Sequence, residues 1–452
     1  MLVYSPVITP RLHYVLLFLG NQWLGKALSA TTNREEALQH SGTLINYSSG
    51  EIKKGELRIE PHGLLSETGI NPPDIVVKNK NNIPFFFETG GDYHFDVFSA
   101  IFYLLSRYEE YLPHQKDNYG RYAHTNSLAF REQFLNRPLV NEWMCDLQQR
   151  IGDSRLTAAK SGTVQTLLTY DIDIAYSYRY KGFTRNIAGA LAELVTFKWK
   201  RLRQRLSVWL GRKPDPFDVF GWLNRLHEKN NLRPYYFFLF APRRGRYDKN
   251  IDPRHPAMQR LVHDHAIRYP VGIHPSWYSG DDPRQLEKEI SLLAAATGAP
   301  VNASRQHYIR MSFPATYRHL LAAGIRFDFS MGYGSINGFR ASVASPFYWY
   351  DLEKDTTTEL LIFPFCYMEA NSYFEQKQTA PAAMAEMRRY YDVVKNTGGL
   401  FCMIWHNSFL TSHDHWAEWR AGYEKFVQEI ICNASAIVAR NPPKPADVGR
   451  KG

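Results

Sequence analysis

An apolar run that ends on two acidic residues is the feature that most constrains the fold of this chain. Residues 167–173 read LLTYDID, so Asp171 and Asp173 follow a stretch with the composition of a buried strand. Residues i and i+2 of a strand lie on the same face. In α/β proteins the carboxyl ends of parallel strands meet at one crevice, where catalytic groups gather. We therefore expect both carboxylates to serve one site, although a helix N-cap or a pair of loop carboxylates would give the same pattern.

Later strand-like runs also end on chemically active side chains. In chain order they lead to His274, to Arg305 with His307, to Asp328, and to Trp405 with His406. A single histidine after a strand is more often structural than functional. The interpretation therefore depends on the whole set, which contains the carboxylates and imidazoles that a hydrolytic site needs.

This series resembles the polysaccharide deacetylases, the NodB-like family also called carbohydrate esterase family 4. Residues 169–173, Thr-Tyr-Asp-Ile-Asp, are similar to the Thr-Phe-Asp-Val-Asp variant of the family's first motif, which implies that Asp171 is the catalytic base and Asp173 a metal ligand. Residues 305–309 resemble the Arg-Pro-Pro-Tyr-Gly motif, which implies that Arg305 orients the base. Trp405-His406 resembles the Leu-His of the last barrel strand, which implies that His406 is the general acid.

The second motif of the family is incomplete in this sequence. The family places two histidines four residues apart, whereas the position four residues after His274 is Tyr278. His307 is a candidate third ligand beside Asp173 and His274, because imidazole suits zinc and similar metals. The expected cofactor is a divalent metal, zinc in the first place. Two alternatives stay open, a metal-free hydrolase in which the histidines bind substrate, and a barrel that has lost catalysis.

The expected fold class is α/β, with two domains. An irregular (β/α) barrel of the polysaccharide deacetylase type is expected over 161–440, after a smaller α+β domain at 1–160 and before a flexible tail at 441–452. The length of 452 residues exceeds the roughly 250–300 residues at which a single core stops growing. Strand and helix signals alternate from Leu167 onward, which favours parallel pairing. Closure into a barrel is implied by the resemblance alone.

The first 160 residues have a different pattern of strand and helix signals, and they contain no recognisable set of catalytic residues. Short strand-like runs occur at 2–8, 14–19, 57–59 and 84–87, and helical spacing of apolar residues occurs at 96–112 and 139–151. The charged residues Arg107, Glu109, Glu110 and Arg121 are interpreted as salt bridges rather than substrate ligands. We place the domain boundary between Ile151 and Thr163.

Much of the positive charge lies in one segment, residues 180–213. It carries nine Lys and Arg residues against one acid, Glu193, and interleaves them with Leu, Phe and Trp. The pattern predicts one or two basic amphipathic helices. They could lie on an anionic membrane, or pack on the barrel by their apolar side with the basic side in water, which we favour. Nucleic-acid binding is the least favoured use.

Composition limits the location and the partners. The net charge of +10 favours an anionic partner. Four widely spaced cysteines argue against a disulfide scaffold. The sequence has no secretory pattern and no apolar run of ~18 residues, so the cytoplasm is expected, with contact to the inner membrane face as an option. A cytoplasmic enzyme would act on a nucleotide- or lipid-linked sugar.

The expected function is removal of an acyl group, N-acetyl in the first place, from a sugar in surface-polysaccharide or cell-envelope biosynthesis. The alternative is an inactive barrel that binds glycan or the membrane surface. Trp277, Tyr333 and Trp405 are candidates to stack on sugar rings, or else they fill the core. Asp328 is a further candidate for substrate binding.

Overall fold

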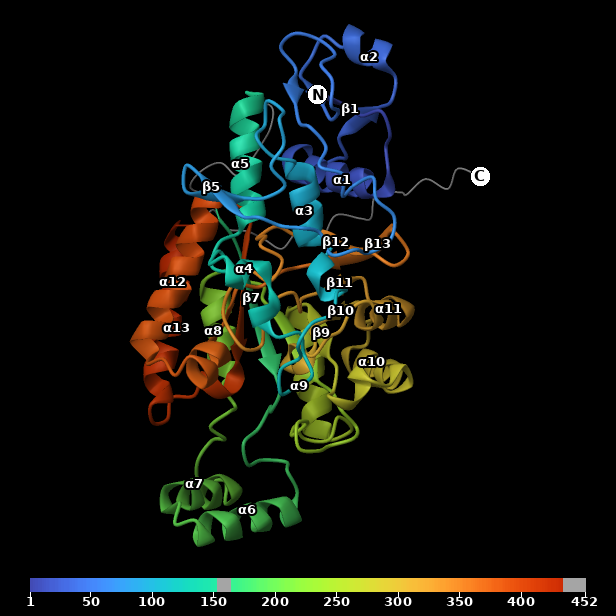
Figure 1. The fold of residues 1–452 in the computed structure, drawn as a ribbon. Helices are drawn as coiled ribbons and strands as arrows, with labels where there is room; N and C mark the ends of the chain where they lie inside the picture. Colours follow the sequence, from blue (N-terminus) through green and yellow to red (C-terminus); the bar gives the residue numbers. More distant parts are fainter. Residues whose placement is uncertain (153–163, 434–452) are drawn as a thin grey trace.

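The computed structural model describes residues 1–152 and 164–433. The domain boundary predicted between Ile151 and Thr163 falls largely outside the described residues, and the tail predicted at 441–452 falls wholly outside them. Residues 1–152, here called the N-terminal region, pack on one end of a barrel that residues 164–433 form (Figure 1).

The N-terminal region begins with a small parallel sheet. Its strands are β1 (Leu2–Tyr4), β2 (Ser29–Thr31), β3 (Leu44–Asn46) and β4 (Leu57–Arg58), in the order β2-β1-β3-β4. All the pairings in this sheet are parallel, with helices α1 (Pro10–Leu24) and α2 (Arg34–Gln39) in the connections. Parallel strands joined by helices are an α/β arrangement, which refines the α+β expectation.

The run at 14–19 is helical, so the prediction of a strand there is wrong. It lies inside α1, where Thr9 accepts a hydrogen bond from the backbone N–H of Leu12 at 3.1 Å and Pro10 occupies the first turn. Gly25 ends the helix with φ 68°. Because α1 packs against α3, β12 and β13, its apolar residues are continuous rather than amphipathic, and such a run does not distinguish a buried helix from a strand.

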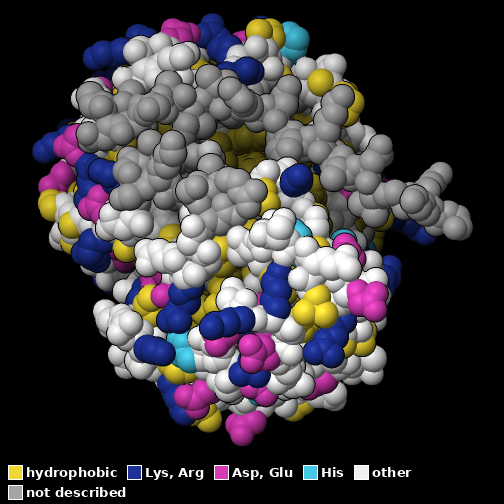
Figure 2. Space-filling view, turned by 90° about the horizontal axis from the view of Figure 1, so that it is seen from above, with side chains coloured by type: hydrophobic (Ala, Val, Ile, Leu, Met, Phe, Trp, Pro, Cys, Tyr) yellow, Lys and Arg dark blue, Asp and Glu magenta, His cyan; other side chains and the backbone are white. Residues whose placement is uncertain are grey.

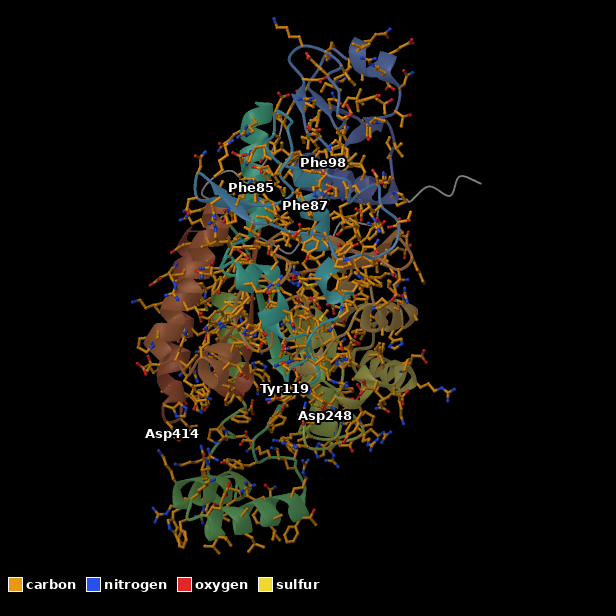
Figure 3. The ribbon with its side chains drawn as sticks, viewed as in Figure 1. Phe85, Phe87, Phe98, Tyr119, Asp248 and Asp414 are labelled. Carbon is orange, nitrogen blue, oxygen red and sulfur yellow. The ribbon has the colours of Figure 1, made fainter. Side chains whose placement is uncertain are left out.

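The rest of the N-terminal region is an antiparallel hairpin and a helical layer. The hairpin is β5 (Lys78–Lys80) with β6 (Ile83–Phe85), and the helices are α3 (Val97–Leu105), α4 (Leu128–Arg131) and α5 (Leu139–Ile151). Helix α5 has the predicted bounds. The helix predicted over 96–112 ends at Leu105, because Arg107 adopts φ 55° before a 3₁₀ turn at Tyr108–Glu110. Phe85, Phe87 and Phe98 mark the aromatic core of this region (Figure 3).

The barrel is built from one nine-stranded sheet in the order β12-β13-β11-β10-β9-β8-β7-β15-β14. Its strands are β7 (Gln165–Ile172), β8 (Tyr235–Leu239), β9 (Val271–His274), β10 (Ala303–Ser304), β11 (Phe327–Asp328), β12 (Phe347–Asp351), β13 (Thr356–Ile362), β14 (Tyr367–Met368) and β15 (Leu400–His406). Every pairing is parallel except that of β12 with β13. The predicted parallel pairing is confirmed.

Ring contacts across the sheet show that it is curved into a barrel. Tyr235 and Phe237 of β8 lie 4.9 and 5.0 Å, centroid to centroid, from Phe329, which follows β11. Strands β9 and β10 separate β8 from β11 in the sheet, so these rings can meet only across a closed interior. Residues 363–366 join β13 to β14, and the N–H of Cys366 donates to the carbonyl of Cys402 on β15 at 3.3 Å. The predicted irregular barrel is therefore confirmed.

Helices cover the outside of the barrel (Figure 1). They are α8 (Phe220–Lys229), α9 (Pro256–Arg268), α10 (Pro283–Thr297), α11 (Ala315–Ala322), α12 (Ala380–Thr397) and α13 (Trp416–Asn433), with short helical turns η3 (Tyr278–Gly280), η4 (His307–Ile309), η5 (Asn371–Glu375) and η6 (Asn407–Phe409). Strands and helices alternate along the barrel, as the sequence predicted.

The basic segment forms two helices, α6 (Phe183–Val195) and α7 (Trp199–Trp209), which pack on each other. They lie apart from the barrel at the end opposite the N-terminal region (Figure 1). One or two helices were predicted and two are present, but the favoured packing of their apolar side on the barrel is wrong. Phe183, Val195 and Phe197 are 65%, 74% and 76% exposed, because the connecting segments hold the pair away from the barrel wall.

Candidate metal centre and active site

Alternation along β7 directs one acidic residue into the barrel. Thr169 and Asp171 point inward, where the Thr169 hydroxyl and Asp171 Oδ1 accept hydrogen bonds from Arg305 Nη1 at 2.6 and 3.0 Å. Tyr170 points outward, and its hydroxyl lies 2.8 Å from His227 Nε2 under α8. Asp173 follows beyond the strand, on the same side as Asp171. The spacing of the two carboxylates thus has the consequence expected from the sequence.

Asp173 meets two histidines that come from neighbouring strand ends. Its Oδ1 lies 3.1 Å from Nε2 of His274, the last residue of β9, and its Oδ2 lies 3.5 Å from Nε2 of His307, which follows β10. The candidate ligand atoms of the three residues lie within 4.8 Å of one another. Among residues 1–152 and 164–433 this is the one group of His, Cys, Asp or Glu side chains with such an arrangement. It could hold a metal ion.

The environment of the donors fits a cation. Nδ1 of His274 lies 2.6 Å from the carbonyl oxygen of Arg305, and Nδ1 of His307 lies 3.1 Å from Asp248 Oδ1. An acceptor at Nδ1 keeps the proton there and leaves the Nε2 lone pair for a metal. Asp173 Oδ1 is buried and has no hydrogen-bond donor among the described residues. A bound cation would satisfy this oxygen.

His406 faces the same carboxylate from β15. Its Nε2 lies 3.6 Å from Asp173 Oδ2, and its Nδ1 lies 2.7 Å from Oε1 of Glu369, a fully buried residue after β14. Burial opposes protonation of His406, but Glu369 and then Asp173 outweigh it and raise its pKa to about 10. The imidazolium is therefore present at neutral pH and has a proton to donate.

The other charges of the centre are coupled in the same way. Burial opposes protonation of His307, but Asp173 and Asp248 raise its pKa to about 9. Burial would raise the pKa of Asp173, but His307 and His406 lower it well below its usual range. Asp173 is therefore ionised, and a metal bound at His307 would take the place of a proton.

Arg305 fixes the second carboxylate. Its guanidinium is fully buried, donates from Nε to the carbonyl of Phe329 at 3.0 Å and holds Asp171 Oδ1. The other oxygen of Asp171, Oδ2, lies 4.0 Å from His274 Nε2. Arg305 therefore holds Oδ1 of Asp171, while Oδ2 faces the ligand group. A base that acts on a metal-bound water requires this geometry.

Tyr278 stands where the second motif of the family has its second histidine, and its ring lies on the loop after β8. The ring of Tyr278 lies against the Arg243 guanidinium, 4.2 Å from its centre, at the start of η3. It is thus turned toward the loop after β8, whereas His307 brings an imidazole to Asp173 from β10.

An aromatic rim lies beside the centre. Trp277 and Tyr247 stack at 4.0 Å, and Tyr308 stacks at 5.3 Å on Tyr119, which the N-terminal region contributes. The backbone N–H of Trp277 donates to Asp248 Oδ1 at 3.0 Å, so the rim is attached to the residue that holds His307. Tyr119 and Asp248 lie at the end of the barrel nearest α6 and α7 (Figure 3). Such rings suit the apolar faces of sugars.

Three predicted substrate residues lie away from the centre. Asp328 is fully buried and accepts hydrogen bonds from Ser304, Tyr317 and Ser330, so its carboxylate is already used inside the barrel wall. Tyr333 is buried against Arg107 and Arg340, between the barrel and the N-terminal region. Trp405 is fully buried against Tyr423 of α13, because it alternates with His406 along β15 and points outward.

Three residues of the site were missed by sequence reasoning. Glu369 follows the apolar run that ends at Met368, so a strand-end signal was present. Asp248 lies in the middle of a basic loop, several residues after β8, and no pattern marks it. Tyr119 belongs to the N-terminal region, whose contact with the barrel rim has no sequence signature.

Comparison with known proteins gives two further findings. Residues 1–154 match a protein family of unknown function, DUF7033. A search of curated proteins finds no match for the chain.

Solved structures similar to this chain include polysaccharide deacetylases, an allantoinase and a pseudoenzyme of carbohydrate esterase family 4. A Mycobacterium smegmatis protein classed with that family is 14% identical, with a TM-score of 0.39, over 60% of this chain and 85% of its own. A Bacillus cereus polysaccharide deacetylase is 10% identical, with a TM-score of 0.30, over 59% and 88%. PuuE allantoinase is 8% identical, with a TM-score of 0.38, over 60% and 85%. The chain is thus similar to polysaccharide deacetylases over about 60% of its length, with the DUF7033 region as an additional N-terminal part.

Proposed function

We propose that the protein is a metal-dependent hydrolase that removes an acyl group, N-acetyl in the first place, from an amino sugar of surface-polysaccharide or cell-envelope biosynthesis. One observation carries the proposal. The donor atoms of Asp173, His274 and His307 converge beside a carboxylate held by Arg305 and an imidazolium held by Glu369. Two histidines and one carboxylate, with positions left for water and substrate, suit catalytic zinc.

The residues divide the hydrolysis of an amide among them. A divalent ion held by Asp173, His274 and His307 would polarise the acyl oxygen and lower the pKa of a bound water. Asp171 takes a proton from the attacking water, whose oxygen bonds to the acyl carbon. His406 gives its proton to the amine as the carbon–nitrogen bond breaks. A carboxylic acid and a free amino sugar are the products, so atoms and protons balance.

The aromatic rim supports a sugar as the acyl carrier. It is formed by Tyr119, Tyr247, Trp277 and Tyr308, and aromatic rings are the side chains that suit the apolar faces of pyranose rings. Arg310 lies over the Trp277 ring at 4.6 Å and pairs with Asp281, which holds the indole in place.

Metal content tests the proposal first. The unmodified protein should bind one equivalent of zinc or a similar ion, and both Asp173→Asn and His307→Gln should lose it. His263→Gln is the matched control, because His263 is an exposed histidine on α9, and it should retain the metal. An unmodified protein that stays empty when metal is added would refute a metal-dependent reaction.

Acetate release then separates an enzyme from a binding protein. The zinc-loaded protein should release acetate from N-acetylhexosamine oligosaccharides or from nucleotide-linked N-acetylhexosamines. Asp171→Asn should keep the metal and lose the release, since Asp171 acts on water rather than on the ion. A metal-loaded protein that binds these sugars without releasing acetate would show that the barrel is an inactive glycan-binding relative.

A further inference from the structure

The hairpin of α6 and α7 (residues 180–213, here called the basic hairpin) carries most of the exposed large apolar side chains. Eighteen large apolar side chains are exposed in the described residues, and ten of them lie between Tyr180 and Leu210. Three consecutive odd positions at the turn, Val195, Phe197 and Trp199, are 74%, 76% and 51% exposed. A concentrated apolar surface of this kind marks an interaction site.

The same hairpin carries a one-sided charge. Its single acid, Glu193, is engaged by Arg205 at 2.8 Å. Lys200 pairs with Asp414 of the barrel. The exposed cations Arg185, Lys198, Arg201, Arg203, Arg212 and Lys213 form no ion pair with a described carboxylate. By contrast, cationic and anionic side chains alternate on the visible surface at the other end of the molecule (Figure 2).

The combination of apolar and basic groups indicates which class of partner the basic hairpin binds. A nucleic acid would use the cations and leave Val195, Phe197 and Trp199 in water. A second copy of the hairpin would bring like charges together. The surface of an anionic bilayer accepts both kinds of group, because Trp, Phe and Leu enter the interface while Lys and Arg contact the headgroups.

The basic hairpin is fixed to the metal centre by its connecting segments. Asp215 accepts hydrogen bonds from the backbone N–H groups of Ser177, Tyr178 and Arg179 at 2.8–2.9 Å, which ties the outgoing segment to the returning one. Asn407, the neighbour of His406, donates to the carbonyls of Ile174 and Phe217, one on each segment, at 3.0 and 2.9 Å. The outgoing segment begins directly after Asp173. The connecting segments therefore join the hairpin to the strand ends that carry Asp173 and His406.

A basic cavity lies between the hairpin and the barrel. Arg185 of α6 and Arg244, in the loop after β8, line a cavity of about 440 Å³ with Pro242 and Gly245. Neither arginine forms an ion pair with a carboxylate of the part of the chain that the structure describes. The same loop continues to Asp248, which holds His307. An anionic headgroup drawn to these arginines would therefore contact the loop that also carries Asp248.

We propose that the basic hairpin binds the surface of an anionic lipid bilayer, with the side chains of its turn in the interface and its cations on the headgroups, and so holds the metal-centre end of the barrel at that surface. This inference does not depend on the proposed reaction.

Vesicle binding by the full-length protein tests the proposal. The protein should sediment with vesicles of equal parts phosphatidylcholine and phosphatidylglycerol, weakly or not with phosphatidylcholine alone, and less as salt rises. Arg201→Gln/Arg203→Gln should weaken binding by about thirtyfold, and Phe197→Ser/Trp199→Ser by a similar factor. The matched control, Arg260→Gln/Ile267→Ser, changes an exposed arginine and an isoleucine that is 70% exposed on α9, and it should bind like the unmodified protein.

Other results would overturn the proposal. Equal binding to both kinds of vesicle would remove the charge requirement, and full binding by Phe197→Ser/Trp199→Ser would remove the apolar one. If the protein is a dimer in solution and these variants are monomers, the hairpin binds a second copy of the chain. If the protein binds DNA and only the arginine variant loses that binding, the hairpin binds nucleic acid. Asp171→Asn should bind vesicles normally, which separates this test from that of the reaction. Tryptophan quenching by brominated lipid in the unmodified protein gives a readout that needs no variant.

Discussion

The three histidines of the candidate metal centre differ in what holds their Nδ1 atoms. His274 has a backbone carbonyl, His307 has Asp248, and His406 has Glu369. A carboxylate stabilises an imidazolium more than a neutral carbonyl does, which suits His406 to proton donation. A carboxylate also raises the basicity of a ligand histidine, so Asp248 should strengthen metal binding at His307.

Asp248→Asn should therefore weaken metal affinity without removing the site. An amide can still accept a hydrogen bond from His307, but it lacks the negative charge, and we expect a loss of roughly 10–100-fold in affinity. Competition with a chromophoric chelator would measure it. Asp252→Asn, in the same loop and with only a local contact to the N–H of Arg254, should leave the affinity unchanged. Equal affinities for Asp248→Asn and the unmodified protein would show that Asp248 does not support the ligand.

At the scale of single residues, the sequence predicts which side chains stand at the ends of strands. Asp171, Asp173, His274 and His406 were predictable because a strand's direction and its alternation decide where its last side chains point. Asp248 and Glu369 were not predicted, since their role depends on which histidine they face, and that contact joins residues 59 and 37 positions apart.

At the scale of elements, caps decide between helix and strand where apolar patterning does not. The hydroxyl of Thr9 caps α1 and also donates to the carbonyl of Leu65 at 2.6 Å. Thr379 occupies the same position before α12 and forms no such cap bond.

Thr9→Ala should lower the free energy of unfolding by about 1 kcal/mol, because it removes the cap and leaves the Leu12 N–H unpaired. Thr379→Ala is the matched control and should change it by less than about 0.5 kcal/mol. Urea unfolding followed by fluorescence would compare them. Equal losses in the two variants would mean that the cap does not stabilise α1.

Two buried histidines behind β7 and β8 make the stability depend on pH. Burial and nearby His265 lower the pKa of His227 to about 3, and burial lowers that of His265 to about 4, both from 6.5. Below about pH 6.5 these histidines are protonated in the unfolded chain and neutral in the folded chain. The free energy of unfolding therefore falls as the pH falls toward 4, by up to ~1.4 kcal/mol per pH unit for each histidine.

His265→Gln should reduce this slope, and His263→Gln, on the exposed side of α9, should keep it. Chemical unfolding at a series of pH values between about 4 and 7 would give the slopes. A slope that is the same in His265→Gln and the unmodified protein would assign the dependence to other groups.

Element lengths explain which parts of the barrel were predictable. Strands β7, β9 and β15 are apolar runs of four to eight residues, and the strand ends predicted near Asp171, at His274 and at His406 lie in them. Strands β10, β11 and β14 have two residues each, too few for periodicity to give their bounds. The strand ends before Arg305 and at Asp328 were nevertheless predicted, whereas β14 was not. The pairing of these three short strands is set by neighbours in the sheet rather than by their own sequence.

At the scale of the molecule, a buried charge network joins the N-terminal region to the barrel. Glu110 accepts hydrogen bonds from Arg107 in its own region and from Arg340 in the barrel, each at 2.8 Å, and Glu109 also binds Arg107. Burial would raise the pKa of Glu110, but Arg340 and Arg107 outweigh it and lower the pKa. Salt bridges, either solvated or between the two domains, were predicted here; Arg107–Glu110 and Arg340–Glu110 are present, they are buried, and the second joins the two parts.

Glu110→Gln should destabilise the protein by about 3–5 kcal/mol, because it leaves buried arginine charge uncompensated. Since the network crosses between the two parts, fluorescence and circular dichroism should still report one shared transition. Glu132→Gln, an exposed control in the same region, should have little effect. Two separate transitions in the unmodified protein would show that the network does not couple the parts.

The arrangement of the parts was the least predictable aspect of the molecule. The sequence indicated two amphipathic helices at 180–213, but not whether their apolar side would find the barrel. It also gave no sign that Tyr119 and Arg121 reach the rim, where Arg121 donates to the carbonyl of Tyr308 at 2.7 Å. Such contacts join surfaces, and hydrophobic periodicity describes only single elements.

The side chain of Arg305 determines from which side molecules can reach the candidate metal centre. It lies over the rings of Phe237, Phe329 and Phe365, 4.7, 5.9 and 5.7 Å from their centres, and these groups plug the barrel beneath the metal centre. A filled interior leaves no passage through the barrel from one end to the other. In the proposed reaction, water and substrate would therefore arrive from the same side by which both products leave. A product that leaves slowly would then compete directly with substrate.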